Sequence, residues 1–275
     1  MTAIKQQAAQ HHSALWYLAR GLIVTGGLVL SVASARADTT LAEVTECMRA
    51  NLPETVRIQQ VRLNTVDRDG TQRLLTGRIV ASRADGRLNA NLRLESPPDL
   101  KDAAYLSREN RDGRDEIFLY VPAMNRVRRV AGGGQSSALF GTDFSYEDMR
   151  QVHDAFSGDQ VTLLGKTELA DRPAHHLEVL RATEAGGVER MQAWVDQSAC
   201  VVLQLDRFDG EQVVKRISSP PDSLKQLPGG QWYAEKVRVE DRLGGSSTEM
   251  TVEKVQVGTD MPERLFNPRS FYLGH

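Results

Sequence analysis

Apolar and polar residues alternate along most of this chain, and the alternation is clearest in residues 87–95, RLNANLRLE. Every even position of that stretch is apolar and every odd position is polar. Successive side chains of a β-strand point to opposite faces, so the stretch predicts a strand with one face on a core or on lipid and the other in water. Similar patterns predict strands near residues 55–66, 72–82, 115–121, 126–130, 160–168, 174–182, 189–196, 200–207, 212–218, 231–240 and 249–257.

Short turn signals separate these stretches and indicate how the strands pair. They include Asp69-Gly70, Asp85-Gly86, Asp209-Gly210 and Gly244-Gly245. Tight turns favour antiparallel neighbours. About a dozen strands joined in this way predict a mainly β protein with a large, strongly curved antiparallel sheet, either a barrel or a half-barrel.

Residues 40–52, TLAEVTECMRANL, depart from the two-residue period. Leu41, Val44 and Met48 recur at helical spacing, and Pro53 follows as a helix stop. The sequence therefore predicts a helix ahead of the first strand.

A second departure is LFGTDFSYEDM, residues 139–149, which combines three aromatic rings with three carboxylates. Ser145 has the position of a helix N-cap, Asp148 lies at the third helical position, and Glu147 suits the first turn. Asp143 is expected to organise a turn by accepting bonds from nearby backbone N–H groups.

The helix predicted to follow Ser145 has an apolar face formed by Tyr146, Met149, His153 and Phe156. A glycine-rich connection, residues 132–134, precedes the segment. A short amphipathic helix on a flexible connection suits a lid or plug over a curved sheet. Simple packing over one end of the sheet would explain the rings equally well.

The start of the chain predicts export. The apolar run of residues 21–35 follows Lys5 and Arg20 and ends in Ala35-Arg36-Ala37, which is typical of a signal peptide cleaved after Ala37. A retained amino-terminal anchor is the alternative. Residues 38–275 are then expected to form a single domain in the periplasm, with 31 basic and 36 acidic side chains. This acidic balance does not favour nucleic-acid binding.

Both cysteines, Cys47 and Cys200, lie beyond the predicted cleavage point. An even pair in an oxidising compartment predicts one disulfide, and two buried thiols are the alternative. The spacing of cysteines and histidines supports no metal site.

No catalytic or cofactor motif stands out. Ser145, Asp148 and His153 are the nearest approach to a catalytic triad, but helix capping already explains the first two. His175 and His176 are adjacent on a predicted strand, so their rings point to opposite faces and cannot chelate one metal ion. The sequence predicts neither an enzyme nor a cofactor.

A basic strand is predicted at residues 126–130, RVRRV. Arg126, Arg128 and Arg129 could contact a lipid head group or an acidic partner. An ordinary solvated strand would have the same composition.

Several sequences of the chain together resemble one known family: YVPAMNRVRR at 120–129, LFGTDFSYEDM at 139–149, CMRANLP at 47–53, VDQ at 195–197 and FNPR at 266–269. They resemble the outer-membrane lipoprotein-sorting protein family, a LolA-like group of periplasmic proteins. The resemblance implies a half-barrel of antiparallel strands around helices, with an apolar cavity for acyl chains. Family members often accompany lipid-exporting transporters of the resistance-nodulation-division (RND) type, and no chemistry by the protein itself is implied.

Two functions follow as hypotheses: a periplasmic carrier of lipid or lipoprotein acyl chains, and a non-carrier adaptor that docks on an inner-membrane transporter. The carrier is the preferred prediction. Its candidate acyl-chain contacts come from the alternating strand and from the lid segment: Leu88, Ala90, Leu92, Leu94, Phe140, Phe144, Tyr146, Met149 and Phe156.

Overall fold

The computed structural model describes residues 39–84, 86–109, 116–131, 134, 136–149, 156, 158–183, 186–258 and 263–273. The predicted signal peptide, residues 1–37, and His153 lie outside these residues. Within the described chain no helix has the length and apolar content needed to cross a membrane.

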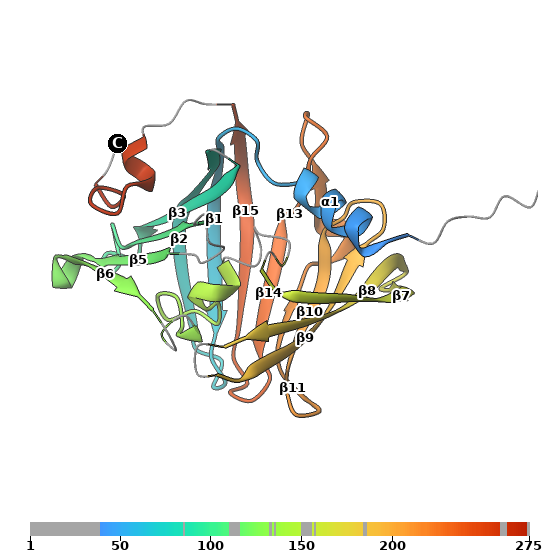
Figure 1. Ribbon diagram of the computed structural model, residues 1–275. Helices are drawn as coiled ribbons and strands as arrows, with labels where there is room; N and C mark the ends of the chain where they lie inside the picture. The colour runs from blue at the N-terminus through green and yellow to red at the C-terminus, as the bar shows by residue number, and fades with distance from the viewer. Residues whose placement is uncertain are drawn as a thin grey trace, which may run out of the picture. The chain divides into compact units, whose positions relative to one another are not determined.

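One large antiparallel sheet of 13 strands dominates the fold, in the order β6-β5-β4-β3-β2-β1-β15-β14-β11-β10-β9-β8-β7. It curves into an open half-barrel (Figure 1), so the half-barrel predicted from the family resemblance is confirmed. A separate hairpin is formed by β12 and β13. The strands are β1 Arg57–Val66, β2 Gln72–Ala84, β3 Arg87–Ser96, β4 Ala104–Arg108, β5 Glu116–Val121, β6 Arg126–Val130, β7 Gln160–Leu169, β8 Arg172–Ala182, β9 Val188–Asp196, β10 Val202–Asp209, β11 Gln212–Ser218, β12 Leu224–Gln226, β13 Trp232–Ala234, β14 Lys236–Asp241 and β15 Ser247–Val257.

The first helix, α1 (Leu41–Ala50), forms as predicted. Thr40 caps it through a reciprocal pair of bonds with Glu43, and Val44 and Met48 are buried. Short 3₁₀ turns lie at Pro122–Met124, Pro221–Ser223 and Glu263–Phe266.

Among the described residues there are 15 strands, against the eleven or twelve predicted. The sequence missed β4 and β12 and merged β13 with β14. In β4 the first four residues are all buried, because Tyr105 belongs to the main core while Ala104 and Leu106 pack under Phe271 on the other face. Because β4 is buried on both faces, its residues Ala-Tyr-Leu-Ser-Arg show no regular alternation of apolar and polar positions.

The two edges of the sheet are next to each other in the chain. Consecutive strands β6 and β7 are the two opposite edges of the sheet. Residues 136–149 lie between these two strands in the sequence, and we call them the crossing segment. Its buried side chains join those of the concave face in one core, to which Leu63, Leu92, Leu139 and Phe144 all belong.

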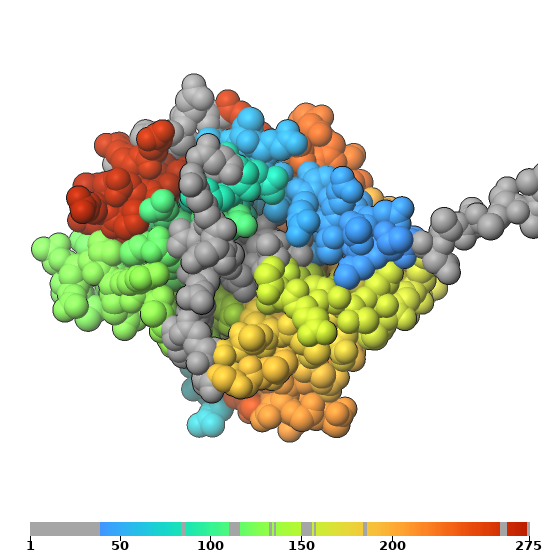
Figure 2. Space-filling view, in the orientation of Figure 1, coloured from blue at the N-terminus to red at the C-terminus, as the bar shows by residue number. Residues whose placement is uncertain are grey.

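The end of the chain covers the convex face. Phe271 is fully buried against Ala104 and Leu106, and the Asn91 amide donates to the carbonyl oxygens of Leu265 at 2.8 Å and Phe271 at 3.0 Å. The space-filling view shows this terminal stretch in red beside the green strands β4–β6 (Figure 2).

Candidate functional site

The crossing segment begins its helix at the predicted residue. The N–H of Asp148 donates to Ser145 Oγ at 3.0 Å, and the N–H of Ser145 donates to Asp148 Oδ2 at 2.7 Å. These reciprocal bonds are a capping box in which an aspartate replaces the usual glutamate. Residues 146–149 are helical, so the predicted N-cap is confirmed.

The aromatic rings of the crossing segment face inward. Phe144 is 0% exposed, and Phe140 and Tyr146 are also buried in the main core. The Tyr105 hydroxyl donates to the Tyr146 carbonyl at 3.0 Å, and the two rings stack with centroids 6.0 Å apart. Burial raises the pKa of Tyr146, against the opposing effect of the nearby Arg128 guanidinium. The rings thus serve the packing of this segment onto the concave face.

Asp143 has different partners from those predicted. Its carboxylate accepts from the hydroxyl of Ser246, and from Thr248 Oγ1 at 2.6 Å. Its own N–H donates to Thr248 Oγ1 at 2.9 Å. Asp143 therefore ties the crossing segment to the start of β15 through hydroxyls about a hundred residues away, instead of organising a turn through neighbouring backbone N–H groups. Sequence spacing could not reveal these partners.

Asp148 also has a second function that capping did not suggest. Its carboxylate is 0% exposed and pairs with Lys215 Nζ, while Arg207 Nη2 lies 3.5 Å away. The neighbouring Glu147 pairs with Arg181 Nη1 at 2.7 Å. Basic residues on the inner face of the sheet therefore neutralise both acids of the short helix.

The same cluster extends along the sheet through further acids. Arg207 Nε pairs with Glu189 at 2.7 Å, and Arg181 pairs with Asp159. Burial raises the pKa of Glu189, and the nearby Arg207 guanidinium opposes that effect. The cluster joins the crossing segment to β8, β9, β10 and β11, so it fastens the segment across several strands.

A cavity of about 140 Å³ lies elsewhere on the concave face, beneath α1 and the β12–β13 hairpin. This volume is well above the roughly 10–15 Å³ that a single water requires, so the cavity can hold a group larger than one water. The walls are mostly apolar and come from many segments: Met48, Asn51, Leu52, Arg57, Gln59, Ile79, Phe156, Cys200, Val201, Val202, Leu205, Ile217, Ser219, Trp232, Tyr233, Ala234, Val237, Met250 and Val252.

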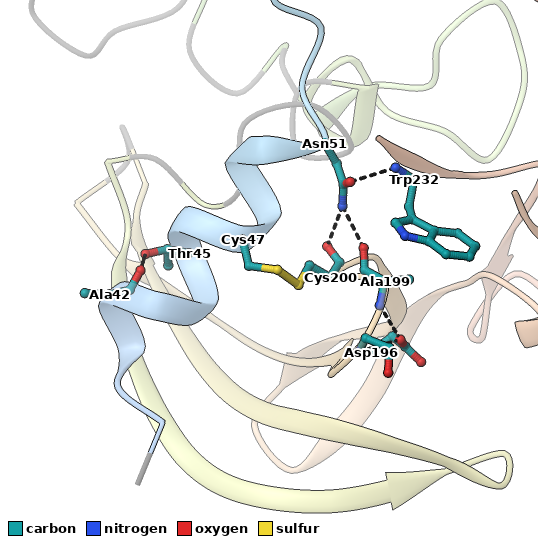
Figure 3. The surroundings of a disulfide bond; sticks show 9 residues. Ala42, Thr45, Cys47, Asn51, Asp196, Ala199, Cys200 and Trp232 are labelled. Atoms are coloured by element: carbon teal, nitrogen blue, oxygen red, sulfur yellow. Dashed lines mark hydrogen bonds between the residues drawn. A yellow bond between two sulfur atoms is a disulfide. The ribbon is translucent and has the colours of Figure 1, made fainter. Parts of the chain in front are cut away.

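Asn51, which follows α1 as its C-cap, holds the roof of the cavity together (Figure 3). Its amide nitrogen donates to the carbonyl oxygens of Ala199 at 2.7 Å and Cys200 at 3.3 Å. Its amide oxygen accepts from the N–H of Trp232 at 2.7 Å. One side chain thereby connects α1, the turn before β10 and the β12–β13 hairpin.

The predicted disulfide forms between Cys47 of α1 and Cys200, with the two Cα atoms 5.7 Å apart (Figure 3). Asp196 organises the turn that carries Cys200, since its carboxylate accepts from the N–H groups of Ser198 at 2.9 Å and Ala199 at 2.6 Å. Burial opposes ionisation, yet Arg172 and these N–H groups hold the pKa of Asp196 below its ordinary value. The turn and the disulfide together fix α1 over the cavity.

The predicted acyl-chain contacts are all buried: Leu88, Ala90, Leu92, Leu94, Phe140, Phe144, Tyr146, Met149 and Phe156. Of these, Phe156 lines the cavity, while Leu92, Leu94 and the crossing-segment residues pack within the core. Their contact with lipid stays a prediction. Most cavity residues were missed because they come from separate segments, and no local pattern brings Met48, Ile217 and Trp232 together.

The basic strand β6 is an edge strand, and Arg126, Arg128 and Arg129 are exposed along it. Arg129 pairs with Glu116 at 3.2 Å on the adjacent strand β5. Arg128 lies near the Tyr146 hydroxyl. A partner contact through this strand stays a prediction.

The described residues contain no group of three or more side chains suited to holding a metal ion. His175 is buried, whereas the ring of His176 stacks on Trp194 and contacts the Gln192 amide at 3.2 Å.

The family model that matches residues 88–272 has the description "-like: Uncharacterized protein". No curated protein matches the chain. Solved structures of other proteins share the fold. A domain from Vibrio parahaemolyticus, provisionally described as an outer membrane lipoprotein-sorting protein, has a TM-score of 0.75 at 19% identity, over 84% of this chain and 97% of the other.

A DUF1329 family protein from Desulfovibrio piger ATCC 29098 has a TM-score of 0.72 at 19% identity, over 82% of this chain and 95% of its own. A LolA superfamily protein from Nitrosomonas europaea has a TM-score of 0.65 at 16% identity, over 83% and 98% of the two chains. The LolA-like fold expected from the sequence resemblance is therefore confirmed.

Proposed function

We propose that this chain, which belongs to a family of uncharacterized proteins and has the LolA-like fold, is a periplasmic carrier that shields the acyl chains of a lipid or lipoprotein. The apolar cavity beneath α1 is the observation that carries the proposal. A carrier must remove hydrocarbon from water, and each buried methylene stabilises the complex by about 0.8 kcal/mol.

The cavity favours the carrier over the adaptor hypothesis. An adaptor that only docks on a transporter needs no internal space, and a core filled by side chains would serve it. Ile217, Val237 and Met250 instead border empty volume on the inner face of the sheet. Apolar walls and few polar groups are typical of a small-molecule site.

The crossing segment is proposed to act as the lid or plug of this carrier, since it lies in the chain between the two edge strands and packs its rings on the concave face. Export to the periplasm, delivery toward the outer membrane and cooperation with an RND-type transporter of the inner membrane belong to the same proposal. The protein would act by binding and would catalyse no reaction.

The test compares lipid bound to the protein purified from cells that express the full chain with lipid bound to a blocked variant. Ala234→Trp would fill the cavity from its wall. Leu243→Trp is the matched control, because Leu243 is exposed in a turn outside the cavity lining.

Mass spectrometry of extracted lipids is expected to find a lipid with the wild type and with Leu243→Trp, and much less with Ala234→Trp. Wild-type protein that is recovered empty and that binds no fluorescent fatty acid would contradict the carrier. Equal lipid in all three proteins would place the binding site elsewhere.

A further inference from the structure

We infer that the cavity binds an amphiphile with an anionic head, holding its carboxylate or phosphate against Arg57 and its hydrocarbon chain along Ile217, Val237 and Met250. The inference names the ligand class of the proposed carrier and therefore rests on that proposed function.

Arg57 is an uncompensated cation in the wall of the cavity. It is the first residue of β1 and is 8% exposed. Its Nη2 donates to the Asn51 carbonyl at 2.8 Å, whereas its Nε is buried with no hydrogen-bond partner. A guanidinium has five N–H donors, so contact with the end of α1 accounts for only one of them. Arg57 forms no ion pair with any described residue.

Burying the guanidinium of Arg57 without a counter-ion costs free energy, and an anionic ligand would offset that cost. Removing a charge from water without a counter-ion is expensive, and buried charges are normally paired. Burial lowers the pKa of Arg57, but a guanidinium remains protonated in proteins. On the same concave face, Arg181 and Lys215 both pair with acids. Arg57 differs from them in facing a cavity.

The polar and apolar parts of the cavity are arranged in sequence along the sheet. Gln59, which follows Arg57 on the same face of β1 at about 7 Å, is buried and lines the cavity. Its amide adds a second polar group to this end of the cavity. Farther along the same pair of strands, β15 contributes Val252 and Met250 to the wall. One end therefore offers N–H donors to an anion and the other offers apolar surface to a chain.

An amphiphile with a charged head matches both ends at once. A guanidinium binds a carboxylate or a phosphate through parallel charge-assisted hydrogen bonds. An uncharged lipid of the same length would fill the apolar part but leave Arg57 without a counter-ion. A small anion without a chain would form an ion pair with the guanidinium but would bury no hydrocarbon in the cavity.

The experiment measures displacement of Nile red, a neutral dye, from the delipidated full-length protein. The competitors are palmitate, palmitoyl lysophosphatidic acid, methyl palmitate and acetate, which separate a carboxylate head, a phosphate head, a neutral head and an anion without a chain. Palmitate or lysophosphatidic acid is expected to bind at least about tenfold more tightly than methyl palmitate, and the stronger of the two identifies the head group.

Arg57→Gln should remove the preference for a charged head, so that the preferred anion binds no more tightly than methyl palmitate. Arg62→Gln is the matched control, because Arg62 lies on the same strand, is about half exposed and already pairs with Glu253 at 3.3 Å. It should bind every competitor as the wild type does.

Equal affinity of the wild type for palmitate, lysophosphatidic acid and methyl palmitate would overturn the inference and leave the carrier proposal intact. This comparison uses only the wild-type protein, so it tests the inference even if Arg57→Gln does not fold. If acetate displaced Nile red as strongly as palmitate does, the inference that the ligand is an amphiphile would likewise be overturned. Failure of the wild type to bind the dye or any competitor would contradict the carrier itself.

Discussion

The crossing segment and the cavity lie on the same concave face but differ in how they treat buried charge. Under the crossing segment, Asp148 pairs with Lys215 and Glu147 pairs with Arg181. In the cavity wall, Arg57 forms no ion pair with a carboxylate of any described residue. The buried charges under the crossing segment are therefore neutralised within the protein. The charge in the cavity wall has the features of a site at which a ligand supplies the counter-ion.

A single strand shows how close the two regions are. Lys215 and Ile217 lie on the same face of β11, two residues apart, and the first neutralises Asp148 while the second borders the cavity. A buried ion pair and the border of the cavity therefore lie about 7 Å apart along one strand. This contrast can be tested by changing each region separately.

The largest effect is expected from Asp148→Asn, which removes the carboxylate beneath the crossing segment. Lys215 and Arg207 would then remain largely buried with one acid fewer, and breaking a buried pair typically costs about 3–5 kcal/mol. Chemical denaturation would measure the free energy of unfolding.

The control for Asp148→Asn is Glu211→Gln, because Glu211 is 98% exposed in its pair with Arg190. An exposed pair contributes roughly 0–1 kcal/mol, so this variant should unfold almost as the wild type does. Similar losses in both variants would show that the buried pair contributes no special stability.

The next largest effect is expected from removing the disulfide beside the cavity. Replacing both Cys47 and Cys200 with serine should lower the free energy of unfolding by about 2–5 kcal/mol, because the bond closes a loop between residues 153 positions apart. Lipid affinity should fall as well, since Cys200 and Met48 belong to the cavity wall. Denaturation and dye binding would measure the two changes.

Reduced wild-type protein provides the matched comparison for the serine variant. It should show the same loss of stability and of dye binding, because in both cases α1 is no longer covalently attached to the turn before β10. Unchanged stability on reduction would show that the contacts of Asn51 suffice to hold α1.

The smallest effect compares the two helix caps. Ser145→Ala should cost about 1–2 kcal/mol, because it leaves the buried N–H of Asp148 without its acceptor. Thr40→Ala, at the exposed cap of α1, should cost about 0.5 kcal/mol, since water can replace the lost bond. Thermal or chemical denaturation would measure the stability lost by each variant. A larger loss for Thr40→Ala than for Ser145→Ala would contradict the idea that the cap of the crossing segment is the more buried of the two.

Much of the fold was predictable because it depends on local patterns. Alternation located β3, and the helical spacing of Val44 and Met48 located α1. The strand β4 escaped because burial on both faces removes the polar residues that reveal a period of two. Ser145 was predictable as a cap for the same local reason, whereas Lys215, the partner of Asp148, was not.

The sequence by itself determined most of the strands, the helix at residues 41–50, the cap at Ser145 and the pairing of the only two cysteines, because each depends on residue types at short spacing or on elimination. Tertiary structure alone decided that the consecutive strands β6 and β7 form opposite edges of the sheet, because this depends on the order in which distant strands pair. It also decided that Arg57 lacks a counter-ion beside a cavity. Whether a buried charge is paired depends on atoms brought close by folding, and residues distant in the chain supply those atoms.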